Sequence, residues 1–157
     1  MKKTTNLKTL TATAYLLLTT FFSFAQDAAK DFTEINFYRI KQSMMSGGAG
    51  LEIKVSLNDK EIGSVLNGTI VKYKLYSEGS LKIKGIATGG GGVVGQPAVI
   101  TIEVKHGQVY NYSASGGMGG AKLELLDEKQ LAKMQKEKFA DTVNVEEDKA
   151  SPVIKQP

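Results

Sequence analysis

The stretch LEIKVSL, residues 51–57, decides the fold class of this chain. Its odd-numbered positions are apolar and its even-numbered positions are polar. Side chains on a β-strand point alternately to the two faces of a sheet, so the pattern predicts a strand with one buried and one solvated face. The turn residues Asn58-Asp59 follow it directly, and Asn67-Gly68 is the dipeptide most typical of a two-residue β-hairpin. The stretch therefore belongs to a series of short strands joined by turns.

Seven further segments repeat this pattern of short strand and turn. Dense turns without intervening helices favour a β-sandwich or barrel over alternating strands and helices. We predict an all-β fold, a single antiparallel β-sandwich of about seven to eight strands at residues 33–126. The predicted strands are residues 33–40, 51–57, 61–66, 71–76, 81–84, 99–105, 108–115 and 121–126.

One short helix is predicted after the strands, at residues 127–139. Asp127 suits the N-cap position, and Gln130, three residues later, completes a capping box with it. The remaining residues, 140–157, are polar and include acidic residues and prolines. This composition predicts a disordered tail.

The first 25 residues have the features of a secretory signal peptide. Three lysines precede an apolar stretch, and Ser23-Phe24-Ala25 places small residues where signal peptidases recognise them. The apolar stretch is interrupted by Thr and Ser and is shorter than the ~20 residues that a membrane span needs. We expect cleavage near Ala25, followed by an N-terminal linker at residues 26–32. The mature chain, without a transmembrane segment, would then work in the periplasm, on the outer cell surface or as a secreted protein.

Removal of this segment changes the charge balance of the chain. The whole sequence has 20 basic and 16 acidic side chains, but residues 1–25 hold three lysines and no acid. The rest therefore has 17 basic and 16 acidic side chains and a net charge of +1. With one Arg and no Trp, this chain is not typical of a nucleic-acid-binding protein.

Two motifs with possible chemistry are better explained as a flexible loop and a tight turn. The glycine pattern GGGVVG at residues 90–95 matches the dinucleotide fingerprint, but Gln96-Pro97 leads from it into a strand. No helix N-terminus would then be present to bind a pyrophosphate. His106 is the only histidine, stands next to a glycine in a predicted hairpin turn, and has no Cys with which to bind zinc. We predict no catalytic residue, no metal and no cofactor.

Glycines and methionines gather in four of the predicted loops. If every connection reverses the chain, the loops at 41–49, 67–68, 88–97 and 116–120 meet at one end of the domain. A pliable rim with exposable apolar surface suits a peptide, a lipid or a partner protein. The competing interpretation is that the loops are merely tolerant and the methionines pack inward. The residues of this glycine-methionine rim are Met44, Met45, Gly47, Gly48, Gly90, Gly92 and Met118.

A lysine face is the second candidate binding surface. Alternation places Lys72 and Lys74 of one strand, and Lys82 and Lys84 of the next, on the polar side, and Lys54 extends the patch. If the two strands form a hairpin, lysine faces lysine, which is destabilising unless an anionic envelope component binds there. The competing interpretation is a solvated face or a guarded sheet edge.

Three segments carry a resemblance to a known family. INFYR at residues 35–39 resembles the aromatic opening strand, "Y-x-Y-R", of the bacterial family called domain of unknown function 2846. LNDKEIG at residues 57–63 is similar to its "D-G-K-x-I-G" turn without the glycine, and GQVYNY at residues 107–112 is similar to its "G-x-x-Y-x-Y" strand. The resemblance covers roughly residues 33–130. It implies an exported β-sandwich domain and brings no catalytic residue with it.

These observations predict a non-catalytic exported binding or accessory module of the bacterial cell envelope. Its partner would be an anionic envelope component or a protein. The alternative is a hydrolase acting on envelope glycan or peptide with catalytic residues that the sequence does not identify. A carboxylate pair lining a cleft would favour that alternative. A purely structural role is the third option.

Overall fold

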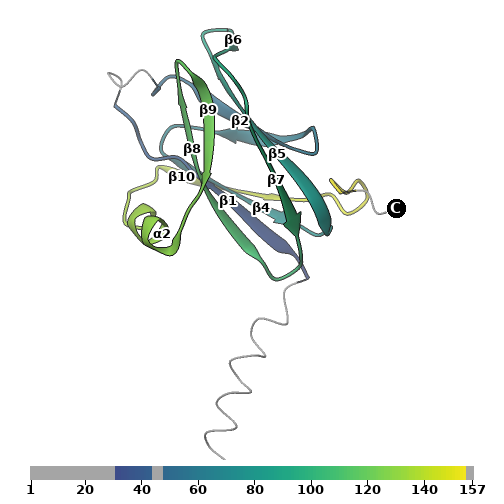
Figure 1. The fold of residues 1–157 in the computed structure, drawn as a ribbon. Helices are drawn as coiled ribbons and strands as arrows, with labels where there is room; N and C mark the ends of the chain where they lie inside the picture. The colour runs from purple at the N-terminus through teal and green to yellow at the C-terminus, as the bar shows by residue number, and fades with distance from the viewer. Residues whose placement is uncertain (1–30, 44–47, 155–157) are drawn as a thin grey trace, which may run out of the picture. The chain divides into compact units, whose positions relative to one another are not determined.

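The computed structural model describes residues 31–43 and 48–154. The described elements belong to the unit formed by residues 32–157. They are mostly β-strands, arranged in two sheets with one short helix (Figure 1). Among the helices of this part of the chain, none has the length and hydrophobicity needed to cross a membrane. The predicted signal peptide and most of the predicted linker lie outside the described residues.

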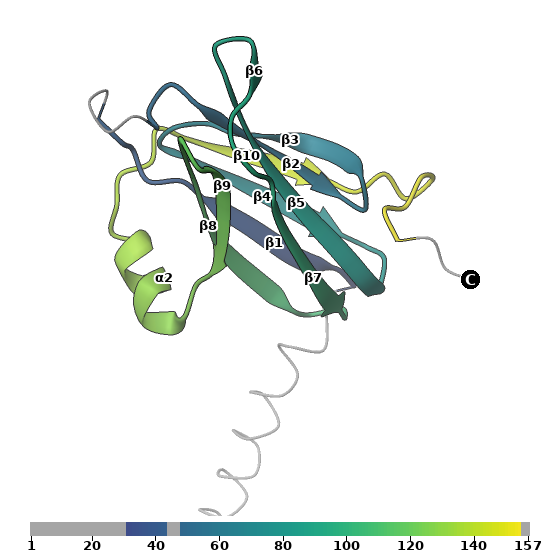
Figure 2. The same ribbon diagram turned by 45° about the horizontal axis from the view of Figure 1, so that its top comes forward.

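Each sheet has five strands. The first has the order β10-β4-β1-β8-β9, and the second has the order β3-β2-β5-β6, with β7 also paired to β5 (Figure 2). The first sheet contains β1 (Thr33–Tyr38), β4 (Thr69–Leu75), β8 (Val109–Gly117), β9 (Gly120–Leu125) and β10 (Asp141–Glu146). The second contains β2 (Glu52–Leu57), β3 (Lys60–Val65), β5 (Gly79–Gly89), β6 (Gly92–Val93) and β7 (Ala98–Val104).

The prediction of a mostly β fold is confirmed, since each of the eight predicted segments contains a strand. The predicted number of strands is too low, because β6 and β10 are additional. The pairing is also not purely antiparallel: β1 pairs in parallel with β8, and β10 with β4. Successive reversals make the first and seventh predicted strands run in the same direction. They pair in parallel because the fold brings them side by side.

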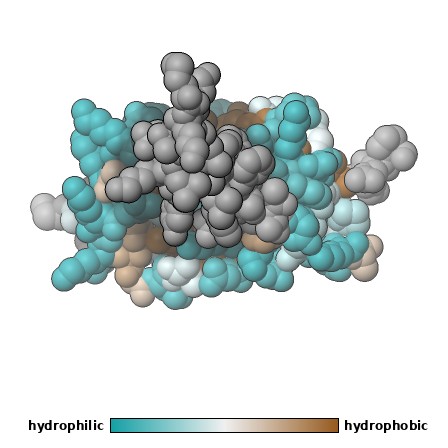
Figure 3. Space-filling model, turned by 90° about the horizontal axis from the view of Figure 1, so that it is seen from below, coloured by the Kyte–Doolittle hydropathy of each residue, from teal (hydrophilic) through white to brown (hydrophobic). Residues whose placement is uncertain are grey.

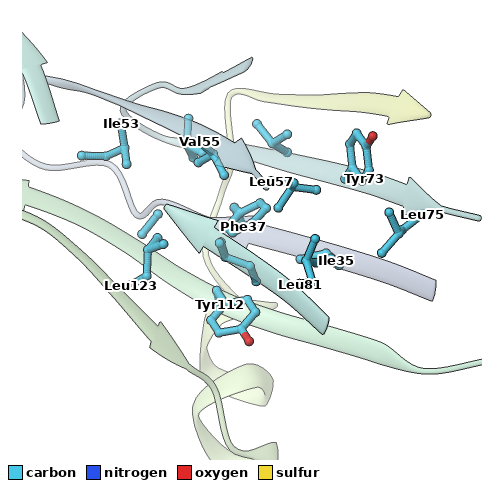
Figure 4. Packing of buried hydrophobic residues seen from close by; sticks show 14 of the residues in the cluster. Ile35, Phe37, Ile53, Val55, Leu57, Tyr73, Leu75, Leu81, Tyr112 and Leu123 are labelled. Carbon is cyan, nitrogen blue, oxygen red and sulfur yellow. The ribbon is translucent and has the colours of Figure 1, made fainter. Parts of the chain in front are cut away.

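The inner faces of the two sheets share one hydrophobic core. Phe37 of β1 and Tyr112 of β8 are buried there with stacked rings, 5.9 Å between centroids (Figure 4). From the second sheet, Ile53, Val55 and Leu57 are buried, while the alternate residues of β2 are partly exposed. The alternation predicted for residues 51–57 is thus present in β2. Most of the described surface seen in Figure 3 is correspondingly hydrophilic.

The helix begins as predicted and ends early. Helix α2 runs over Glu128–Met134, and Asp127 and Gln130 form the capping box, with each side chain accepting from the other's backbone N–H. The predicted end at residue 139 is wrong. Beyond the helix, Phe139 packs edge-on against Tyr38, with 6.0 Å between ring centroids. This contact directs the chain back to the first sheet.

The prediction of a disordered tail is wrong for residues 140–154. β10 pairs with the edge of β4, and Glu147, the residue directly after β10, is buried. Val153 and Ile154 then join the hydrophobic core. The composition indicated disorder because most side chains of β10 are exposed. The order of this segment comes instead from backbone pairing, from the hydrogen bonds of the Glu147 carboxylate and from the burial of Val153 and Ile154.

Candidate functional site

The described parts of the four predicted rim loops lie together at one end of the two sheets. The side chain of Asn67 forms two hydrogen bonds with the backbone of Gln42. The N–H of Gln42 donates to Asn67 Oδ1 at 2.8 Å, and Asn67 Nδ2 donates to the carbonyl of Gln42 at 3.0 Å. The N–H of Gln96 donates to the carbonyl of Gly119 at 3.1 Å. Gly48 connects these two pairs of loops, because a Cβ added to it would lie only 2.4 Å from the carbonyl oxygen of Gly116.

The predicted rim residues differ in their surroundings. Gly48 is buried, whereas Gly90 and Gly92 are exposed on the β5–β6 hairpin. Met118 is 88% exposed, so this methionine does not pack inward. Met44, Met45 and Gly47 lie outside the described residues.

Arg39 supports the rim from the inside. It is only 1% exposed, and its guanidinium donates to the carbonyl of Val65 at 2.9 Å and to that of Gly48 at 2.8 Å. None of the described acidic residues forms an ion pair with it, and burial lowers the pKa of Arg39. Arg39 is the only arginine of the chain and directly follows the apolar strand β1, so the sequence could have singled it out. Its position beneath the rim could not be read from the sequence.

A cleft of about 770 Å³ opens beside these loops, and we call it the rim cleft. Glu52 and Lys54 contribute to it from β2, which lies between β3 and β5 in the second sheet. On the β3 side it is lined by Leu66, which follows that strand. On the β5 side it is lined by residues 88–93, the hairpin that rises to β6 (Figure 2). Gly50 contributes from the loop before β2.

The two charged groups of the rim cleft have different environments. Glu52 lies opposite Thr88 in the sheet, and its carboxylate accepts a hydrogen bond from the Thr88 hydroxyl at 3.0 Å. Lys54 lies opposite Ser64 on one side and Ile86 on the other. It forms no ion pair within the described part of the chain. Its positive charge is therefore available to a ligand.

The glycine hairpin has a packed base and an unpacked tip. A Cβ on Gly89 would lie 2.5 Å from Leu51 Cδ2, whereas nothing lies within 4 Å of one on Gly90 or Gly91. The φ angles of Gly90 and Gly91 are +58° and +96°, as glycines permit at a tight hairpin turn. Neither N–H donates a hydrogen bond to another described residue. The tip therefore presents bare backbone donors beside the cleft.

The predicted lysine face does not form, because β4 and β5 belong to different sheets. Lys72 and Lys74 lie on the first sheet, whereas Lys54, Lys82 and Lys84 lie on the second. The connection after β4 crosses between the sheets instead of closing a hairpin. The expectation that lysine faces lysine is therefore wrong.

Two of the lysines outside the cleft, Lys74 and Lys82, have acidic neighbours that balance their charge without a ligand. Lys74 pairs with Glu146 at 2.7 Å, and the hydrogen bond and charge of that carboxylate raise the pKa of Lys74. Lys82 pairs with Asp59 at 3.1 Å. Of the five predicted lysines, Lys54 is the one that lines the rim cleft. Of the two candidate surfaces predicted from the sequence, the structure thus brings one lysine, Lys54, next to the glycines of the rim.

The structure places both of these motifs in connections between strands. The glycines at residues 90–95 lie in a hairpin and a short connection that leads to β7, not to a helix. His106 lies in the turn before β8, and its Nε2 is 3.0 Å from the carbonyl oxygen of Tyr76. Among the residues that the structure describes, no group of three or more His, Cys, Asp or Glu could hold a metal ion.

Comparison with family models, with curated proteins and with solved structures gives no match to this chain. The resemblance to the domain of unknown function 2846 family therefore stays a prediction.

Proposed function

We propose that this chain is an exported, non-catalytic binding module of the bacterial cell envelope, built as a β-sandwich, with the rim cleft as its binding site. The observation that carries this proposal is the unpaired cation of Lys54 in a cleft formed by loops from several parts of the chain. Binding sites are typically concave surfaces with a few polar groups placed by a rigid scaffold. The signal-peptide features of residues 1–25 support the location.

The groups in the rim cleft suit binding better than hydrolysis. Glu52 is the one carboxylate among the described residues that line it, and it already accepts a hydrogen bond from Thr88. Another cleft, beside α2, is lined by both Glu124 and Glu137. Both side chains are exposed, and Glu124 pairs with Lys122 at 2.7 Å. Because hydrolytic carboxylate pairs generally include one desolvated acid, these two do not favour the hydrolase alternative.

The ligand should combine an anionic group with apolar surface. Lys54 supplies the positive charge. Leu66 and Val93, on either side of β2, are 50% and 66% exposed. Apolar side chains that line a cleft are available for contact with the apolar part of a ligand. An envelope molecule with these two properties would neutralise the lysine and remove both side chains from water.

Co-sedimentation with purified outer-membrane, lipid and peptidoglycan fractions tests the proposal. Lys54→Gln should weaken binding to the recognised fraction. Lys84→Gln is the matched control, because this lysine lies on the adjacent strand of the same sheet, has no ion pair within the described residues and does not line the cleft. Equal effects of the two substitutions, or no binding to any fraction, would contradict the proposal.

A further inference from the structure

We propose that the rim cleft binds a peptide segment that ends in a free carboxylate and carries an aliphatic side chain. This inference rests on the proposed function and specifies the ligand of the same site. It follows from the charge balance of the cleft, from its exposed backbone and from its two apolar side chains.

The charge balance selects a ligand with a single negative charge. Among the described residues that line the cleft there is one cation, Lys54, and one anion, Glu52. Recognition of an anionic membrane surface typically uses clusters of about four to eight basic residues. A polyanionic glycan would likewise place further negative charges near Glu52. A single ligand carboxylate beside Lys54 would balance the charge of this lysine and bring no further negative charge close to Glu52.

The spacing of the two charged groups matches an extended peptide. Glu52 and Lys54 are two residues apart on β2, and a strand rises about 3.3 Å per residue. An extended peptide has nearly the same rise, so a carboxylate at Lys54 would place a peptide N–H within reach of Glu52. Thr88 uses one hydrogen-bonding position of the Glu52 carboxylate, which has further lone pairs.

The walls of the cleft supply the remaining contacts. The free N–H groups of Gly90 and Gly91 can donate to peptide carbonyls, which the acyl chain of a fatty acid does not have. Leu66 and Val93 supply exposed apolar contacts on the two sides of the cleft for aliphatic parts of the peptide. A cleft whose lining includes unpaired backbone N–H groups thus favours a peptide over an alkyl chain, which cannot accept their hydrogen bonds.

The test uses N-acetylated tripeptides of Ala, Val and Leu, each as the free acid and as the C-terminal amide, titrated into the purified protein by calorimetry. Free acids should bind roughly tenfold or more tightly than amides, because the hydrogen bond to Lys54 is charge-assisted. Lys54→Gln should abolish this difference, and Lys84→Gln should preserve it. Leu66→Ala should weaken binding of both forms to a similar degree.

Three outcomes would overturn the inference. They are equal affinity for acids and amides, a preference for acids that survives in Lys54→Gln, and octanoate binding as tightly as the best free acid. If the tripeptides do not bind while envelope binding still depends on Lys54, the ligand class is wrong and the proposed function stands. If envelope binding is also absent, both fail.

Discussion

Replacing Glu147 with alanine is expected to lower the free energy of unfolding by about 3–5 kcal/mol. This residue is 4% exposed, and its carboxylate accepts four hydrogen bonds. The backbone N–H groups of Tyr76, Ser77 and Val153 donate at 2.6, 2.9 and 2.6 Å. The hydroxyl of Ser77 donates at 2.8 Å. One side chain thus joins the end of β4 to the C-terminal segment.

The magnitude follows from the donors that the substitution leaves without partners. A buried polar group that loses its only partner costs about 1–3 kcal/mol. Three backbone N–H groups are affected, while the hydroxyl of Ser77 can rotate to another acceptor. Water entering the space left by the carboxylate can replace part of the loss, which keeps the expected cost below the sum of the individual penalties. Because a domain of this size is stable by about 5–15 kcal/mol, the effect should be large.

Urea unfolding followed by circular dichroism measures this effect. Glu146→Ala is the matched control, because that side chain is 57% exposed and forms a surface ion pair with Lys74. Its loss should cost no more than about 1 kcal/mol. The reasoning would be refuted if Glu147→Ala changed the free energy of unfolding by less than about 1 kcal/mol, or if both substitutions cost the same.

Three further predictions concern the core and the rim. Arg39→Met should lower the free energy of unfolding in urea by about 1–3 kcal/mol, because two buried carbonyls lose their donor; a gain in stability would show that desolvation of the guanidinium outweighs those bonds. Burial, with the nearby charge of Glu147, raises the pKa of Tyr73 to about 12, above its ordinary value of 10.0. The unfolded chain therefore loses this proton first, and stability should fall as pH rises from about 10 to 12; Tyr73→Phe should reduce that fall by about 2 kcal/mol in urea titrations across this range, and an unchanged profile would contradict the assignment. Gly91→Val should lower the free energy of unfolding by about 1–2 kcal/mol, and with it the midpoint of thermal unfolding, because valine is strained at a φ of +96°. Gly90→Asn should leave the midpoint nearly unchanged, because asparagine tolerates a φ of +58°. Equal effects of the two substitutions would contradict the turn geometry.

Local patterns were sufficient for the features that depend on neighbouring residues. The alternation in residues 51–57 predicted which side chains of β2 are buried, and Asp127 with Gln130 predicted the start of the helix. The convergence of the rim loops was also predictable. Counting chain reversals places alternate loops at the same end, whichever sheet each strand joins.

The tertiary structure decided which strands are neighbours, and with that the composition of the candidate site. Backbone pairing between distant segments leaves no local periodicity, so the placement of β4 and β5 in separate sheets could not be read from their alternation. Because of that placement, Lys72 and Lys74 lie on a different sheet from Lys54, Lys82 and Lys84, so no common lysine face forms. Lys54 instead lines the rim cleft together with the glycine hairpin. For the same reason the polar residues after 140 resemble a disordered tail. They become ordered because the edge of β4 and the donors around Glu147 are present only in the folded chain.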